Sequence, residues 1–84
     1  MDNSLTLRVL TPSGTAFEGT VDAVYVPGTA GRFEVLPGHA PIITTLSEGL
    51  LRWRSGAGEE SVKVLSGALR LHDAILTVCA ELEK

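Results

Sequence analysis

The chain has 84 residues, a length that suits one domain spanning residues 1–84. Hydrophobic residues make up 44% of it and charged residues 20%, a balance that disfavours global disorder. The net charge is −3 and the seven Lys and Arg form no run, which disfavours nucleic-acid binding. The N-terminus lacks the features of a signal peptide, and no window approaches the ~20 apolar residues of a membrane span. We therefore expect a soluble protein with no direct membrane insertion.

Apolar and polar residues alternate along short segments, the pattern of strands with one buried face. No window of eleven or more residues shows helical periodicity. Turn signals recur every eight to twelve residues or so, which predicts an all-β fold, an antiparallel β-sandwich or flattened barrel. In chain order, the strands are expected over residues 5–9, from residue 17, and over 21–26, 32–36, 42–46, 51–54, 61–64, 69–72 and 75–80.

Glycine and proline mark the connections between these strands. We expect a type I turn at residues 11–14, a bulge or bend at Gly19, a hairpin loop at 55–58, a bend at 66–67 and a tight connection at 73–74.

Several apolar side chains are expected in the core, although some of them can instead form an exposed patch for a partner. Cys79 lies in the apolar run 75–80 and cannot form an internal disulfide because it is the only cysteine. We expect it to be a small buried hydrophobe, since no electropositive neighbourhood for a reactive thiol is visible. The other expected core residues are Tyr25, Phe33, Ile43, Leu51 and Trp53.

The stretch Val26–Pro41 contains two Pro-Gly pairs, Pro27-Gly28 and Pro37-Gly38, on either side of an apolar/polar alternation. Proline presets φ for the second position of a turn, and glycine takes the positive φ that a type II turn needs next. The stretch is therefore expected to form a turn, a short strand and a second turn. Pro41 restricts the residue before it to extended geometry, so His39 lies on backbone with little freedom.

Three side chains of this stretch can each be interpreted in two ways. His39 is either a contact residue at the tip of a stiff loop or a ring that hydrogen-bonds the turn backbone, and both can hold together. Arg32 and Glu34 share one face of the expected strand. Their charges either discourage edge-to-edge pairing or complement the charge of a partner.

Candidate metal ligands are His39, His72, Asp73 and Cys79, but their spacing lacks the paired Cys-x-x-Cys or His-x-x-x-His of zinc sites. The serines occur in no Gly-x-Ser-x-Gly elbow, and the glycines match neither a phosphate loop nor a dinucleotide fingerprint. We expect no catalytic residue, metal, cofactor or small-molecule ligand.

The stretch Val26–Pro41 closely resembles the signature of the epsilon subunit of the proton-translocating ATP synthase, which mitochondria call delta. The family pattern is Val-Pro-Gly-x-x-Gly-x-Phe/Leu-x-Val/Ile-x-Pro-Gly-His-Ala-Pro, followed by apolar residues. The resemblance extends to segments 7–14, 17–19, 21–24, 46–51 and 65–68, and so covers essentially the whole chain, but only the N-terminal domain of the family. The matching positions are Gly28, Gly31, Pro37, Gly38, His39, Ala40 and Pro41.

This resemblance implies a β-sandwich of about ten short strands that acts as a non-catalytic rotor subunit of the central stalk. Such a domain docks on the gamma subunit and the c-ring and couples proton-driven rotation to ATP synthesis. It is peripheral on the cytoplasmic face of the bacterial inner membrane, held there through the complex. The implied contact loop comprises Gly31, Arg32, Glu34, Pro37, Gly38, His39, Ala40 and Pro41.

The chain departs from the family at three points. Many members have an acidic residue in place of Arg32 and glycine in place of Glu34, so the charge on the loop differs. Many also continue into a regulatory helical hairpin beyond the position of Lys84, and we expect this chain to lack it. The alternatives are a stand-alone β-sandwich interaction module outside ATP synthase and a small hydrolase or metal-binding domain.

Overall fold

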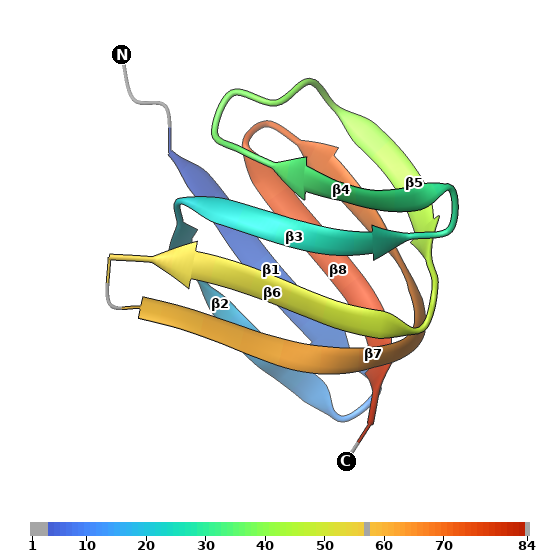
Figure 1. Ribbon diagram of the computed structural model, residues 1–84. Coiled ribbons are helices and arrows are strands. Elements are labelled where there is room, and N and C mark those ends of the chain that lie inside the picture. The colour runs from blue at the N-terminus through green and yellow to red at the C-terminus, as the bar shows by residue number, and fades with distance from the viewer. Residues whose placement is uncertain (1–3, 57, 84) are drawn as a thin grey trace.

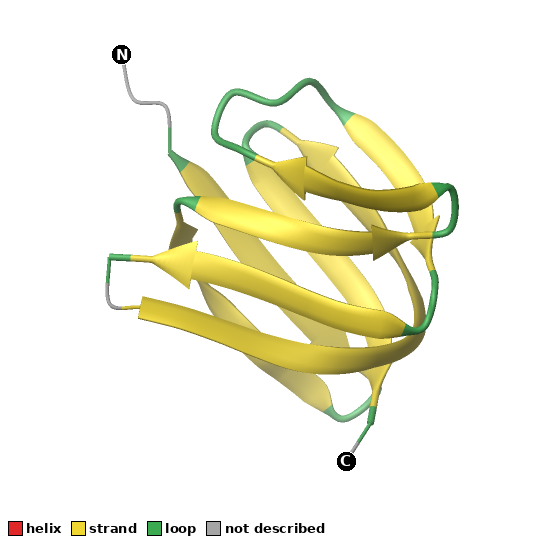
Figure 2. Cartoon of the chain, in the orientation of Figure 1, coloured by secondary structure: helices red, strands yellow, loops and turns green. Residues whose placement is uncertain are grey.

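The computed structural model describes residues 4–56 and 58–83, which form eight strands and no helix (Figures 1 and 2). The all-β prediction is confirmed, with fewer strands than the ten or so expected. The irregularities predicted at Gly19 and at residues 66–67 do not interrupt the strands in which these residues lie. The strands are β1 (Leu5–Thr11), β2 (Gly14–Val21), β3 (Ala23–Gly28), β4 (Gly31–Val35), β5 (Ile42–Leu46), β6 (Gly49–Ser55), β7 (Gly58–His72) and β8 (Ile75–Leu82).

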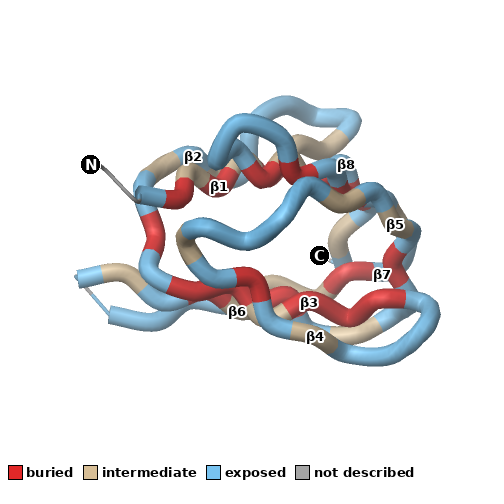
Figure 3. Tube along the Cα trace, turned by 90° about the horizontal axis from the view of Figure 1, so that it is seen from above, coloured by how far each residue is buried: buried red, intermediate tan, exposed pale blue. Residues whose placement is uncertain are grey.

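The strands form two layers that enclose the core (Figure 3). Hydrogen bonding follows the order β2-β1-β8-β7-β5-β3-β4, and β6 pairs with both β3 and β7. The 15-residue strand β7 belongs to both layers, since its first half pairs with β6 and its second half with β5 and β8. Its register with β8 shifts between Val64 and Ser66, where the strand passes from one layer to the other. The result is a flattened barrel.

The antiparallel arrangement is confirmed for every strand pair of the described residues except one. Strands β1 and β8 pair in parallel, from Thr6↔Ile75 to Leu10↔Cys79. Parallel neighbours need a long connection, and here most of the chain lies between them. Sequence periodicity carries no signal of such a distant pairing.

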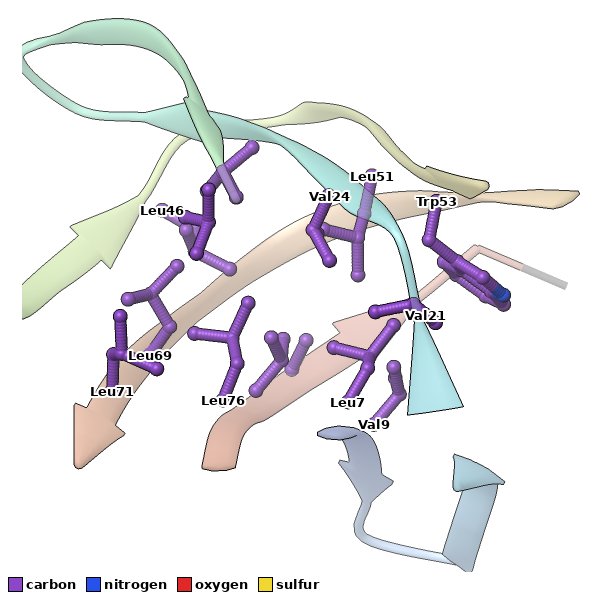
Figure 4. Packing of buried hydrophobic residues seen from close by; sticks show 14 of the residues in the cluster. Leu7, Val9, Val21, Val24, Leu46, Leu51, Trp53, Leu69, Leu71 and Leu76 are labelled. Atoms are coloured by element: carbon purple, nitrogen blue, oxygen red, sulfur yellow. The ribbon is translucent and has the colours of Figure 1, made fainter. Parts of the chain in front are cut away.

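The core is made almost entirely of aliphatic side chains that alternate along the strands. Leu7 of β1 and Leu76 of β8 point toward Val24 and Leu51 of the opposite layer (Figure 4). No polar or charged residue of the described segments is buried. The buried cluster consists of Leu5, Leu7, Val9, Val21, Val24, Val26, Val35, Leu46, Leu51, Trp53, Val64, Leu69, Leu71, Leu76, Val78 and Ala80.

The core prediction is correct for Leu51 and Trp53, and Phe33 packs partly buried against the cluster. It is wrong for Ile43, a residue that is 80% exposed because its side chain points away from the core on β5. Cys79 is also exposed, since on β8 it alternates with the buried Val78 and Ala80. Tyr25 lies on an outer face, half-buried.

Two aromatic rings close one side of the core. Phe17 of β2 and Trp53 of β6 have ring centroids 4.7 Å apart at an interplanar angle of 38°. Of the predicted bulge or bend at Gly19, the bulge is wrong, since Gly19 pairs with Leu7 and the register shift falls between Val9 and Leu10. Glycine instead leaves room for the Phe17 ring, because a Cβ at position 19 would lie 3.2 Å from its Cζ.

The tight connection predicted between β7 and β8 is confirmed, and it predicts a stabilising substitution. Asp73 and Ala74 have φ of 52° and 63°, the left-handed values of a type I′ turn. Alanine is strained there, so Ala74→Gly should raise the free energy of unfolding by about 1 kcal/mol in urea denaturation. Ala68→Gly on strand β7 is the control and should lower it by about 0.5–1 kcal/mol. A loss of stability in Ala74→Gly would contradict the turn assignment.

Candidate functional site

The first part of the Val26–Pro41 stretch is a hairpin, and one predicted turn within it is wrong. Pro27 and Gly28 belong to β3, and the turn falls at Thr29 and Ala30, between the paired Gly28 and Gly31. Gly31 takes the positive φ, 134°. Gly28 permits close approach instead, since a Cβ there would lie 2.8 Å from the Gly31 carbonyl oxygen.

Hydrogen bonds fasten this hairpin to the end of β5. The amide of Thr29 donates to the Thr45 carbonyl at 3.1 Å, and the two threonine hydroxyls lie 2.9 Å apart. The amide of Ser47 donates to the carbonyl of Pro27 at 2.7 Å. The hairpin is therefore attached at its tip as well as through its strands, which restricts its movement.

The second predicted turn is confirmed. The amide of His39 donates to the Leu36 carbonyl at 3.0 Å, closing a turn with Pro37 and Gly38 at its centre. Gly38 has φ of 89°, the positive value that the third position of a type II turn requires. Ala40 and Pro41 then lead, exposed, into β5. The loop is rigid because its proline, its glycine and its hydrogen bond all favour the same geometry.

The His39 ring is exposed and also bonded to the backbone. Its Nδ1 lies 2.7 Å from the Ala40 carbonyl oxygen, which can only accept, so Nδ1 carries the hydrogen. In the neutral ring Nε2 is then an acceptor available to a partner. The backbone-bonding reading of His39 is confirmed, and the contact reading stays a prediction.

Arg32 lies at the other end of β4 from this loop. Its Nη2 donates to the Leu50 carbonyl at 3.1 Å, so the side chain reaches the start of β6. Glu34, also exposed, is paired with Tyr25 across β3 and β4. Four residue steps of ~3.3 Å place Gly31 and Val35 about 13 Å apart, so the eight predicted site residues divide between two ends of β4. Strand β4 ends the strand order, which fits the edge-protecting reading of the two charges.

Two exposed apolar side chains beside the loop were missed as site candidates. Leu36 is 44% exposed at the start of the turn, and Ile43 follows just after it. The two adjacent isoleucines gave no sequence signal, and in the structure burial alternates along β5, so that Ile43 points away from the half-buried Ile42. Together with the loop they give this end of the molecule a partly apolar surface, the composition that partner-binding sites show.

A substitution at Gly38 tests the turn. Gly38→Ala should lower the free energy of unfolding by about 1 kcal/mol, because alanine is strained at a φ of 89°. It should also speed hydrogen exchange of the His39 amide, whose bond closes the turn. Ala40→Gly is the comparison, because it keeps the turn glycine. Slow exchange preserved in Gly38→Ala would contradict the type II assignment.

The candidate metal ligands do not come together in the described residues. Within residues 4–56 and 58–83, no three His, Cys, Asp or Glu side chains are grouped so that they can hold a metal ion. The same residues include no helix long and apolar enough to span a bilayer. The two histidines lie on different elements, His39 in the loop and His72 at the end of β7.

Comparison with known proteins gives consistent matches. Residues 4–82 match the family described as ATP synthase, delta/epsilon chain, β-sandwich domain. An ATP synthase epsilon chain of Parasynechococcus marenigrum is 42% identical over 64 residues, which are 76% of this chain and 47% of that protein. One from Rhodopseudomonas palustris is 40% identical over 73 residues, 87% of this chain and 54% of that protein. The chain thus spans about half the length of these curated relatives.

Solved structures share the fold. A chain of the Euglena gracilis mitochondrial ATP synthase, from an assembly that includes the c-ring, superposes with a TM-score of 0.89 at 17% identity. That match covers 99% of this chain and 54% of the other. A chain from the central stalk and c-ring of the Tetrahymena thermophila enzyme gives 0.82 at 11% identity, covering 95% and 66%.

The fold and the site define a small β-sandwich whose candidate site includes a stiff, exposed loop. The chain belongs to the ATP synthase delta/epsilon family, and residues 4–82 correspond to its β-sandwich domain.

Proposed function

We propose that residues 1–84 act as one domain, the β-sandwich of an ATP synthase epsilon subunit. In this role the domain is a non-catalytic part of the central stalk that docks on the gamma subunit and the c-ring. It couples proton-driven rotation to ATP synthesis and is held at the cytoplasmic face of a bacterial membrane through the complex. The observation that carries the proposal is the family match over residues 4–82, together with epsilon-chain relatives at 40–42% identity.

The geometry supports a mechanical role. A rotor subunit transmits torque through packed interfaces, which calls for a stiff body. The shared strand β7 joins the two layers covalently, and β1 and β8 tie the first strand to the last. Leu36, His39 and Ile43 give the partner a surface of mixed apolar and polar character at one end. Arg32 provides a separate, positively charged side chain at the other end of β4.

Reconstitution tests this proposal. The chain, added to an ATP synthase depleted of its epsilon subunit, should copurify with gamma and the c-ring and restore proton-driven ATP synthesis. His39→Ala and Arg32→Glu should each weaken copurification, by removing one contact at each end of β4. Glu59→Gln on β7 is the control and should behave as the parent chain.

One kind of result would count against the rotor assignment, and another would count against the contact loop alone. Failure to copurify with any ATP synthase subunit, or capture of an unrelated protein instead, would favour the stand-alone interaction module. If both variants bound as well as the parent chain, the rotor assignment would stand, but the predicted loop would not be its contact site.

A further inference from the structure

A small hollow of about 210 Å³ lies on the outer face of the layer built from β1, β8 and the second half of β7. Its side chains alternate with buried core residues of the same strands, so they point away from the core. Arg70 is paired with Ile43 of β5, so the hollow lies beside that end of the candidate site, but its lining includes none of the eight predicted site residues. Its lining residues are Arg8, Arg70, His72, Ile75 and Thr77.

Strand register brings the polar members of this set together. Thr77 is paired with Arg8 on one side and with Arg70 on the other. With strands ~4.8 Å apart, the two arginine Cα atoms lie about 10 Å from each other with the threonine between them. His72 follows Arg70 by two residues and therefore shares its face. Two guanidinium groups, an imidazole and a hydroxyl thus surround one hollow.

Arg70 differs from the other basic residues of the described chain. Within residues 4–56 and 58–83 it makes no hydrogen bond or ion pair, and no aromatic ring faces it. The other basic side chains there all have partners. These are Glu18 for Arg8, the Leu50 carbonyl for Arg32, the Tyr25 ring for Arg52, the Tyr25 hydroxyl for Arg54, and Glu48 and Glu83 for Lys63.

The flanking carboxylates leave the cations only partly neutralised. Glu18 lies 3.6 Å from Arg8 Nε, too far for a hydrogen bond, and that buried nitrogen has no hydrogen-bond partner. Asp73 lies 3.2 Å from His72 Nδ1, which leaves Nε2 of the ring unused. Because the chain is acidic overall, an unpaired arginine beside a loosely paired one is a local exception.

We propose that this hollow binds a phosphate group. Arginine forks on both sides donate charge-assisted hydrogen bonds to its oxygens, and the hydroxyl of Thr77 adds a donor between them. A tetrahedral oxyanion presents oxygens in enough directions to meet donors from two strands at once, which a single planar carboxylate does less well. Glu18 competes for Arg8, so binding is weak and falls with added salt.

Titration of the 84-residue chain with inorganic phosphate, at constant ionic strength and followed by backbone amide NMR, tests the site. We expect saturable shifts centred on Arg70 and Thr77. Arg70→Gln should weaken binding about tenfold, and Glu18→Gln should tighten it by removing the competing carboxylate. Arg52→Gln, which removes a cation from the other layer, is the matched control and should leave the affinity unchanged. Arg70 is exposed, so its variant should keep the unfolding midpoint of the parent.

Methyl phosphate distinguishes the source of the group. Equal affinity for methyl and inorganic phosphate supports an esterified phosphate, and a marked preference for the inorganic ion supports the free anion. Three results would overturn the proposal. They are shifts spread over the whole surface without saturation, an equal loss of affinity in Arg52→Gln and Arg70→Gln, and tighter binding of acetate than of phosphate.

Discussion

Gly67→Ala is expected to lower the free energy of unfolding by about 3 kcal/mol, through overpacking against backbone atoms. A Cβ at this position would lie 2.5 Å from the Cys79 carbonyl oxygen and 2.8 Å from Ala80 Cα. Backbone cannot rotate away as a flexible side chain can, so β7 and β8 would have to separate. They would separate just after the register shift at which β7 passes between the layers.

Urea denaturation of the variant measures this loss, and Gly56→Ala provides the control. No atom lies within 4 Å of a Cβ built at Gly56, and its φ lies outside the left-handed range. The control should therefore change stability by no more than about 0.5 kcal/mol. Equal effects of the two substitutions would show that the close approach at Gly67 does not exist in solution.

Trp53→Ala is expected to cost about 4 kcal/mol, since it removes the largest buried side chain and its contact with Phe17. A chain of 84 residues is typically stable by about 4–13 kcal/mol, so the variant should be close to unfolding at 37 °C. Far-UV circular dichroism in urea is the suitable measurement, because Trp53 is the only tryptophan and its fluorescence is lost with it.

Trp53→Phe should be much milder, at about 1–2 kcal/mol. The indole Nε1 is buried without a hydrogen-bond partner, and leaving such a donor unpaired costs about 1–3 kcal/mol. Phenylalanine keeps most of the ring packing and removes that penalty, which offsets part of the lost contact. A loss as large as that of the alanine variant would mean that the ring contact with Phe17 contributes little.

Local features of the sequence predicted local features of the structure well. Alternation placed Leu51 and Trp53 inward, and the Pro37-Gly38 pair predicted its turn because the φ preferences of two adjacent residues suffice to specify it. The same dipeptide at Pro27-Gly28 led to a wrong turn prediction. There the pairing of β3 with β4 decided the conformation, and the turn moved two residues onward.

Features that depend on distant partners were out of reach of sequence reasoning. In an apolar run such as 75–80, or in the pair Ile42-Ile43, both faces read as hydrophobic, so the sequence does not say which face is covered. This is why the exposure of Ile43 and Cys79 was missed. The position of Arg32 depends on the Leu50 carbonyl, 18 residues away, and so the division of the candidate site between two ends of β4 was missed as well.

The parallel pairing of β1 with β8 has a consequence for synthesis of the protein on the ribosome. Strand β1 emerges first, yet its permanent neighbour on one side is the last strand to appear. Until then the backbone groups along that edge of β1 have no strand partner, and β1 pairs only with β2 on its other edge. The unpaired edge belongs to a strand whose inward side chains, Leu5, Leu7 and Val9, are apolar. An unpaired strand edge can pair with another chain, so the nascent domain should be most prone to aggregate through β1 until β8 has left the exit tunnel.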